Sequence, residues 1–211
     1  MENGPSGDEM SWQKPQPALY VRPHSTESAA ADRAGKAAER PREDYSMDEY
    51  RMFVRGVADG PWPSETILNR SADHAAVIIE NLFRKSEHQI EILTSELKRD
   101  VYATSGVIEA AIDFLRRNDD GELRILSETK LDRNSHPFFA AIEAAQLAER
   151  VKVGTIPANQ QDYKFNFAVA DAKSFRFEES RDSFEAIVGF GHEKFANRLH
   201  IVFGTLATLA A

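Results

Sequence analysis

The sequence predicts an α/β fold with a mixed sheet, preceded by a disordered N-terminal tail, and three observations support this prediction. From Ala72 onward, amphipathic helical segments alternate with short apolar strands, as expected of a sheet covered by helices. Asp162–Glu179 has the pattern of two strands joined by a tight turn, so that part of the sheet should be antiparallel. Residues 1–44 hold five of the nine prolines and few apolar residues, so they cannot bury enough surface to offset the entropy lost on folding.

Changes in composition divide the chain into three parts. Residues 1–44 form the tail, residues 45–71 a short helix followed by a proline-rich connector, and residues 72–211 an α/β domain. No internal repeat is visible, so we expect a single α/β unit.

A capping box predicts the start of the short helix. Ser46 can cap the helix, and Glu49 lies three residues further on, where its side chain can reach back to the cap. We expect the helix to end at Gly56 or Gly60 and to pack on its own domain, with packing on another subunit as the alternative. The connector Pro61–Pro63 should be extended, because each proline fixes its own backbone angle and restricts the residue before it. Helical structure is expected to resume after the connector.

In the domain, helices and strands are expected to alternate at first, which favours a parallel sheet with the antiparallel hairpin at one side. Apolar residues recur every three or four positions in the helical segments, so each has one apolar face. The expected helices are Ala75–Phe83, Val107–Leu115, Pro137–Leu147 and Phe195–Leu206. The expected strands are Gln89–Ser95, Glu122–Ser127, Val151–Ile156 and the two halves of the hairpin.

Within the hairpin, apolar and polar residues alternate on both sides of a turn at Asp171–Lys173. Successive side chains of a strand point to opposite faces, so the phenylalanines and Val169 should share one apolar face. The polar side chains expected to point away from that face are Lys164, Asn166, Arg176 and Glu178.

Composition excludes several classes of protein and site. The chain has no cysteine, which excludes disulfides, thiolate metal sites and a cysteine nucleophile. Its net charge of −8 disfavours a general nucleic-acid binder, although local basic patches stay open. The N-terminal residues hold no apolar stretch long enough for a signal peptide, and no run of about 18 apolar residues occurs in the sequence. The six histidines do not cluster and no cofactor motif occurs, so we expect no metal, no cofactor, no membrane contact and a cytoplasmic protein.

The order of elements, together with the hairpin, resembles a single repeat of the phospholipase D superfamily over roughly residues 72–211. The segments that carry the resemblance, besides the hairpin, are Ile90–Thr94, Val101–Tyr102, the helix from Val107, Leu123–Leu126 and Phe195–Leu206. In that family the hairpin carries the motif His-x-Lys-x4-Asp. The resemblance implies that one histidine attacks phosphorus, that its counterpart from a second repeat protonates the leaving group, and that the lysines bind phosphate oxygens. Because two motifs must meet, it also implies that a one-repeat member is a homodimer.

Aligned on the hairpin, the histidine position falls on Lys164, the lysine position on Asn166 and the aspartate position on Asp171. The spacing is intact, but two of the three side chains differ. A lysine is protonated at neutral pH and is a poor nucleophile toward phosphorus, and an asparagine carries no charge to offset phosphate. Aspartate is also common in turns for local hydrogen bonding. We therefore expect the fold of the family without its catalysis.

Two sets of residues are candidates for binding a ligand. Lys164 and Arg176, with Glu178 beside them, could hold a phosphate-like anion; the alternative is an ion pair of Arg176 with Glu178 or Glu179. The second set follows the strand that ends near Ser95, where ligands lie in open α/β sheets. This second set consists of Lys98, Arg99 and Tyr102, and the alternative for it is a solvated charged loop.

Three functions remain open. The first is a catalytically inactive phospholipase D-like module that acts as a dimeric scaffold or regulatory protein and binds an anionic ligand. The second is a divergent phosphodiesterase or nuclease of the same superfamily. Its catalytic residues would be Lys164, Asp171 and Arg176, with His136 or His192.

The third function is an adaptor that captures another protein. The tail, with its apolar cluster around Trp12 and Tyr20, and the helix around Tyr50–Phe53 would provide the contact. A homodimer, and a protein partner bound by these segments, are therefore the partners expected from the sequence.

Overall fold

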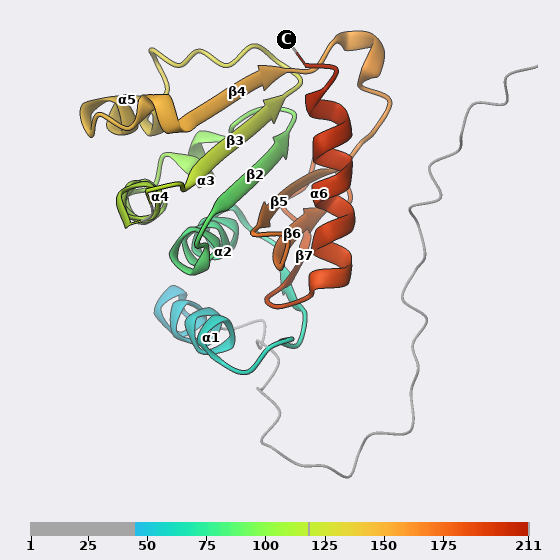
Figure 1. Cartoon of the computed structure of the whole chain (residues 1–211). Coiled ribbons are helices and arrows are strands. Elements are labelled where there is room, and N and C mark those ends of the chain that lie inside the picture. The colour runs from blue at the N-terminus through green and yellow to red at the C-terminus, as the bar shows by residue number, and fades with distance from the viewer. Residues whose placement is uncertain (1–44, 118, 211) are drawn as a thin grey trace, which may run out of the picture. The chain divides into compact units, whose positions relative to one another are not determined.

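Seven strands form one mixed sheet in the computed structural model, which describes residues 45–117 and 119–210 (Figure 1). The strand order is β1-β7-β6-β5-β2-β3-β4. The parallel strands are β2 (Gln89–Thr94), β3 (Glu122–Ser127) and β4 (Val151–Thr155). The antiparallel strands are β5 (Asn166–Ala170), β6 (Ser174–Glu178), β7 (Ala186–Gly189) and β1 (Ile67–Asn69). The α/β class and the mixed sheet are confirmed, whereas the tail expected at residues 1–44 lies outside the described residues.

Helices cover both faces of the sheet, so the domain is an α/β/α sandwich (Figure 1). One face carries α1 (Met47–Asp59), α2 (Ala72–Lys85), α3 (Arg99–Tyr102), α4 (Ser105–Arg117) and α5 (Pro137–Ala144). The other face carries α6 (Glu193–Ala207), which packs on β5, β6, β2 and β3. Two short 3-10 helices, Ala148–Arg150 and Ala158–Gln160, lie in the connections on either side of β4. Within the described residues, no helix has the length and apolar character needed to cross a membrane.

Helix α1 begins at the capping box and packs on α2. The Ser46 backbone N–H donates to Glu49 Oε2 at 2.9 Å, and the Ser46 side chain accepts from the Glu49 N–H at 3.4 Å. The helix ends at Gly60, one of the two expected positions. Its buried residue Tyr50 is 1% exposed and stacks on His74 of α2, with 3.9 Å between ring centroids. The helix therefore packs on its own domain, as expected.

The structure contains two strands that the sequence analysis did not predict, β1 and β7. After the connector, where helical structure was expected to resume, the chain instead forms β1, and α2 begins only at Ala72, capped by Ser71. β1 pairs with β7, so that Ile67 lies opposite Val188 and Asn69 opposite Ala186. The expectation of a helix here was wrong because the strand exists through this long-range pairing and not through a local pattern.

Both faces of the hairpin are buried. Phe167, Val169 and Phe175 pack in the core under α6, whereas Ala168 belongs to the core on the other face, with α2. The alternation in sequence therefore separates two covered faces rather than a buried face from a solvated one. Three of the four polar residues expected off the apolar face, Asn166, Arg176 and Glu178, are buried, and Lys164 is exposed.

Candidate functional site

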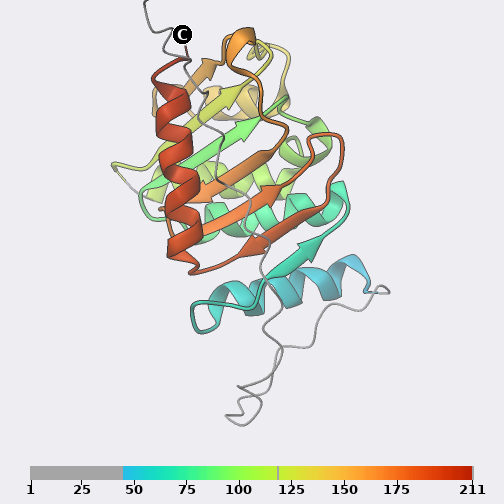
Figure 2. The same ribbon diagram turned by 90° about the vertical axis from the view of Figure 1, so that its right-hand side faces the viewer.

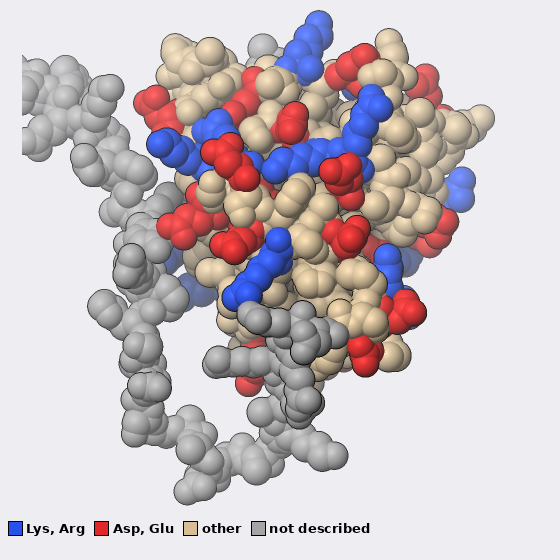
Figure 3. Space-filling model, turned by 180° about the vertical axis from the view of Figure 1, so that it is seen from behind, with Lys and Arg blue, Asp and Glu red and all other residues tan. Residues whose placement is uncertain are grey.

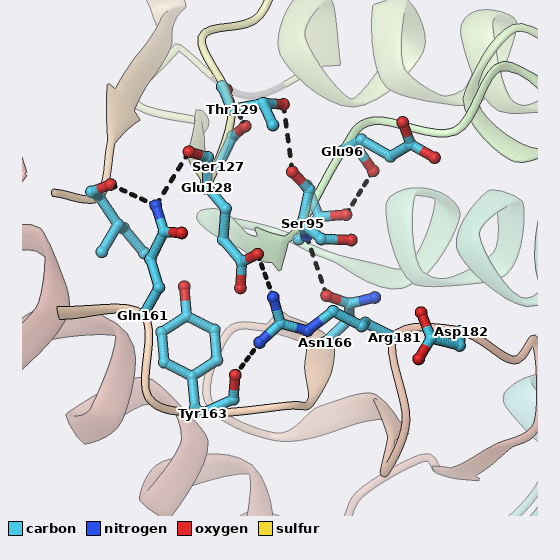
Figure 4. Close-up of polar contacts among 12 residues, drawn as sticks. Ser95, Glu96, Ser127, Glu128, Thr129, Gln161, Tyr163, Asn166, Arg181 and Asp182 are labelled. Carbon is cyan, nitrogen blue, oxygen red and sulfur yellow. Dashed lines mark hydrogen bonds and ion pairs between the residues drawn. The ribbon is translucent and has the colours of Figure 1, made fainter. Parts of the chain in front are cut away.

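The candidate site lies at the edge of the sheet where the parallel strands end. β5 runs antiparallel to β2, so the start of β5 lies beside the end of β2. Asn166, the first residue of β5, accepts through Oδ1 a hydrogen bond of 3.0 Å from the Ser95 N–H, just after β2 (Figure 4). Loops after β2, β3, β4 and β6 meet at this edge. Ligands of open α/β sheets lie at such edges.

Four buried side chains form a hydrogen-bonded row, the polar ladder, beneath this edge: Asn69, Arg176, Glu178 and Asn166. Arg176 Nε donates to Asn69 Oδ1 at 2.9 Å, and Nη2 donates to the Phe184 carbonyl at 3.1 Å. Arg176 Nη1 is paired with Glu178 Oε1. Glu178 Oε2 accepts from Asn166 Nδ2 at 2.7 Å. Every nitrogen of the Arg176 guanidinium thus has a protein partner, which is what a buried charge requires.

The polar ladder leaves little room for a ligand. The hollow beside it measures about 20 Å³, which is space for about one water molecule. Tyr102 of α3 lines this hollow and is itself buried. Burial raises the pKa of the Tyr102 phenol, and the Glu178 charge acts in the same direction while Arg176 opposes it, so Tyr102 stays neutral at ordinary pH. A phosphodiester could enter only by displacing the ladder.

The three motif positions are not gathered at one place. Lys164 is exposed, and its carbonyl accepts from the Arg181 N–H at 3.0 Å. Asn166 belongs to the polar ladder. Asp171 lies at the other end of β5, where its N–H donates to the carbonyl of Gln89 at 2.9 Å at the start of β2. Asp171 therefore lies roughly 17 Å from Asn166 along β5, and Lys164 lies two residues further away.

The Asp171 carboxylate accepts four hydrogen bonds from the segment that leads into β2. It accepts from the Ser86 hydroxyl at 2.9 Å and from three successive backbone N–H groups at 2.7–2.9 Å. The backbone donors belong to Glu87, His88 and Gln89. Asp171 thus fastens the hairpin turn to the segment that leads into β2.

A second polar group joins the loops at the same edge (Figure 4). Arg181, from the loop after β6, pairs with Glu128 after β3 and donates to the carbonyl of Tyr163 before β5. Gln161 Nε2 donates to the Glu128 carbonyl at 3.0 Å. Glu128 Oε1 and the Tyr163 hydroxyl are buried without a hydrogen-bond partner among the described residues. Burial raises the pKa of both side chains, and the Arg181 charge lowers each of them in part.

Glu128, Arg181 and Asn69 are not among the site residues predicted from the sequence. Glu128 directly follows the carboxyl end of β3. Lys98 and Arg99 were predicted as binding residues because they follow the carboxyl end of a strand, so the same criterion would have predicted Glu128. Asn69 lies in β1, and Arg181 lies in the loop between β6 and β7. No local sequence pattern predicts β1 or β7, so these two residues could not be placed in the site from the sequence.

Lys98 and Arg99 line a larger hollow above the ends of β2 and β3, with a volume of about 510 Å³. Lys98 Nζ donates to the Arg181 carbonyl at 3.1 Å and lies 4.4 Å from the centre of the Phe184 ring. Arg99 Nη2 donates to the Ser135 carbonyl at 3.0 Å. The charged side chains around this hollow are Lys98, Arg99, Lys130, Glu96, Asp100 and Asp132. Positive and negative groups are therefore equal in number there.

The two histidines considered for catalysis have backbone partners. His136 is buried and caps α5: its Nδ1 accepts from the Phe138 N–H at 3.3 Å, and its Nε2 lies 2.8 Å from the Leu97 carbonyl. Burial lowers the pKa of His136, so the ring is neutral. His192 Nε2 lies 2.5 Å from the carbonyl of Ser64. Within the described residues, no group of three or more His, Cys, Asp or Glu could hold a metal ion.

On the opposite face of the sheet, a buried carboxylate joins α6 to β2. The Glu91 side chain is 2% exposed; its Oε2 lies 2.7 Å from His200 Nδ1 of α6, and its Oε1 lies 3.1 Å from Arg124 Nη1 of β3. The Arg124 guanidinium also lies 5.1 Å from the centre of the Phe203 ring. Burial raises the pKa of Glu91, His200 and Arg124 counteract this in part, and Glu122 adds to it.

Replacing Arg124 by methionine is expected to lower the free energy of unfolding by about 2–3 kcal/mol at pH 7.5, because a buried carboxylate loses one of its two partners. Methionine keeps the apolar contact with Phe203. The pKa of Glu91 is raised in the folded state, so the protein loses stability as the pH rises and Glu91 becomes ionised. The loss should therefore shrink as the pH falls from 7.5 to 5, because Glu91, whose pKa is raised, takes up a proton.

Urea unfolding of both proteins at the two pH values measures this loss. In the Glu91→Gln background the same Arg124→Met change should cost less than about 1 kcal/mol, since no buried charge is left without a partner. A loss that stays constant or grows on acidification would contradict the role given to Glu91.

Comparison with known proteins identifies the family and the fold. A family model described as "Domain of unknown function (DUF7931)" matches residues 71–206. The search of curated proteins finds no match. Among solved structures, the domain is similar to the phospholipase D family member Nuc from Salmonella typhimurium, with 10% identity and a TM-score of 0.50. That match covers 70% of this chain and 96% of Nuc.

Two further solved structures are similar. TrmBL2, described as an archaeal chromatin protein with a novel mode of DNA binding, matches with 9% identity and a TM-score of 0.52 over 72% of this chain. The chain spans about half of TrmBL2, 55% of its length. NucT from Helicobacter pylori matches with 11% identity and a TM-score of 0.49, over 70% of this chain and 98% of NucT. At these identities the likeness concerns the fold alone.

Proposed function

The chain belongs to the DUF7931 family and has the fold of the phospholipase D family member Nuc, and on this basis we propose that it is a non-catalytic phospholipase D-like module. In this proposal it acts as a dimeric scaffold or regulatory protein. The observation that carries the proposal is the polar ladder, in which Asn166 is bonded to Glu178 and Glu178 to Arg176. These residues occupy the edge of the sheet where the motif would act.

The side chains present at the motif positions do not supply the chemistry of phosphoryl transfer. Lys164 is exposed, and a lysine ammonium group is a poor substitute for the imidazole that attacks phosphorus and transfers the proton in the family. Asn166 already uses both ends of its amide, with Ser95 and Glu178. These two replacements favour a protein that has kept the scaffold and lost the reaction.

The alternative, a divergent phosphodiesterase, would need a different set of catalytic groups close together. Asp171 lies roughly 17 Å from Asn166 along β5. His136 and His192 are held by backbone groups in other parts of the fold. Arg176 has three protein partners and is 4% exposed. None of these groups converges with Lys164 on a common hollow.

We place an anionic ligand of the module, which is part of the proposal, in the 510 Å³ hollow over β2 and β3. Lys98, Arg99 and Lys130 line it together with Glu96, Asp100 and Asp132, so an anion would bind through the three basic side chains there, whereas Arg176 is already neutralised by Glu178. A nucleic acid is not proposed as this ligand. The chain carries a net charge of −8, and on the face shown in Figure 3 lysines and arginines are interspersed with acidic residues rather than gathered.

The adaptor function is not favoured by the position of α1. Tyr50, which would form part of the contact, is 1% exposed and packs on α2. Met52 of the same helix is 69% exposed and remains open to solvent. Any role of residues 1–44 lies outside the described residues.

The purified full-length protein is expected to show no hydrolysis of bis(p-nitrophenyl) phosphate above the rate in buffer, between pH 5 and 9 and with or without added Mg²⁺, because no imidazole stands at the motif. The release of p-nitrophenolate measures the rate. Lys164→Ala should leave this background unchanged and serves as the matched control.

Hydrolysis by the wild-type protein that disappears in Lys164→Ala would contradict the proposal and favour the divergent phosphodiesterase. The same readout on Asp171→Asn, which keeps a hydrogen-bond acceptor in the turn, separates a catalytic role of Asp171 from a structural one.

A further inference from the structure

An apolar part of the sheet lies beside α6, on β6, β7 and β1. Phe177, Ile187 and Leu68 lie directly opposite one another on these three neighbouring strands, so their side chains share one side of the sheet. Phe195 of α6 joins them, with its ring 5.8 Å from that of Phe177. We call these four residues the β7 face.

The β7 face is open to solvent. Leu68 is 58% exposed, Ile187 40% and Phe195 37%, and Phe177 is half-buried. Helix α6 packs on β5, β6, β2 and β3, and Figure 2 shows β7 and β1 beside it rather than beneath it. Single exposed apolar residues are common, but four adjacent ones, three on the sheet and one on α6, are typical of an interaction surface.

Opposite charges border the β7 face on two sides. Glu179 and Glu185 are exposed and follow the same strand alternation as Phe177 and Ile187, so they lie on the same side at the ends of β6 and β7. On α6, Lys194 and Arg198 are exposed and four residues apart, so they share one side of the helix. Glu193 is also exposed but lies about 100° around the helix from Lys194.

We propose that two copies of this chain associate through the β7 face; the inference rests on the dimeric function proposed above. In a two-fold interface the same surface of both copies is in contact. A residue at one border of the surface therefore meets the residues at the opposite border of the second copy. An apolar centre with acidic residues on one border and basic residues on the other is complementary to itself under this symmetry. Lys194 and Arg198 of one copy then lie near Glu179 and Glu185 of the other.

The charge of the whole molecule favours a contact that is apolar or balanced in charge. Each copy carries a net charge of −8, so two copies repel each other unless the contact itself is apolar or balanced. The β7 face is apolar at its centre, and the border pairs Glu179 with Glu185 and Lys194 with Arg198 are opposite in charge; Glu193 also lines the hollow beside Phe195. A hollow of about 440 Å³ beside Phe195, lined also by Pro63 and His192, gives room for a side chain of the second copy. Aromatic residues at the centre of an interface commonly carry much of the binding energy.

The test uses the full-length protein and its mass in solution, measured by sedimentation over a range of concentrations. The wild-type protein should be a dimer, and Ile187→Lys should raise the dissociation constant at least about tenfold, because it places a charge in the apolar centre. Circular dichroism confirms that the variant is folded, as expected for a residue that is 40% exposed. A variant with Glu109→Lys and Asp113→Lys, exposed on α4, is the matched control and should dimerise like the wild type.

Charge reversal tests the two-fold arrangement itself. A basic-border variant (Lys194→Glu with Arg198→Glu) and an acidic-border variant (Glu179→Lys with Glu185→Lys) should each dimerise at least about tenfold more weakly than wild type. Mixed together, the two variants should form a heterodimer, because their borders are then opposite in charge.

The outcomes separate the two proposals. A wild-type dimer that is unaffected by Ile187→Lys and by both reversals overturns the β7 face and leaves the dimeric function standing. A wild-type monomer at every concentration overturns both. Two reversal variants that remain monomeric when mixed overturn the two-fold arrangement.

Discussion

Replacing Asp171 by alanine is expected to lower the free energy of unfolding by about 3–4 kcal/mol. The carboxylate accepts four hydrogen bonds of 2.7–2.9 Å, from the Ser86 hydroxyl and from three successive backbone N–H groups. Hydrogen bonds to a charged group contribute about 1.5–3 kcal/mol each, but water can replace some of these bonds because part of the site is exposed. The loss is therefore smaller than the sum of four bonds. Chemical denaturation followed by circular dichroism measures it.

Asp171→Asn is the matched control for this change. Asparagine has the same shape and keeps one acceptor oxygen, so we expect a loss of only about 1–2 kcal/mol. Asn also tolerates the left-handed backbone conformation found at Asp171, where φ is +51°. An Asp171→Ala protein as stable as the wild type would contradict the structural role.

The Asp171 result bears on how the motif is interpreted. Asp171 matches the phospholipase D motif by spacing, yet its hydrogen bonds join the hairpin turn to the start of β2. A residue with this structural task can persist whether or not the neighbouring positions are catalytic. The presence of Asp171 is therefore weak support for catalysis, and the side chains at Lys164 and Asn166 decide the matter.

The strongest local patterns of the sequence were sufficient to predict most of the sheet and its helices. The helices α2, α4 and α6 have apolar residues every three or four positions, and β2, β3 and the hairpin have dense apolar or alternating patterns. β1 and β7 have three and four residues and no alternation long enough to recognise. They form because residues about 120 positions apart pair, as Ile67 does with Val188, and such pairing is not encoded locally.

The candidate site was predicted in part, for a similar reason. The alternation of apolar and polar residues placed Asn166, Arg176 and Glu178 on the same face of the hairpin. For Arg176 the two predicted roles were anion binding and an ion pair with a neighbouring glutamate, and the structure has the pair with Glu178. The sequence did not indicate that a second helical layer covers that face. Alternation shows which side chains share a face, but the covering layer is set by tertiary packing. The same limit hid Asn69, which reaches Arg176 of β6 from the edge strand β1, with β7 between them.

Replacing Arg176 by methionine is expected to lower the free energy of unfolding by about 3–5 kcal/mol. The change leaves the Glu178 carboxylate, which is 5% exposed, without its cation, and it leaves Asn69 Oδ1 without its Nε donor. Removing one member of a buried ion pair costs this much because the remaining charge cannot be solvated. Methionine is shorter than arginine but similar in volume, so the loss of packing is small compared with the loss of charge pairing. Urea unfolding at pH 7 gives the value.

The double variant Arg176→Met with Glu178→Leu is the control that separates charge from packing. With both charges removed, most of the lost stability should return, since a buried ion pair and apolar residues of similar volume are often equivalent in stability. Asn166 then keeps its bond to the Ser95 N–H but loses its partner Glu178, so recovery should fall short of the wild type by about 1–2 kcal/mol. An Arg176→Met protein that unfolds like the wild type and loses the binding of inorganic phosphate would contradict this account. It would show that Arg176 holds a ligand rather than the fold.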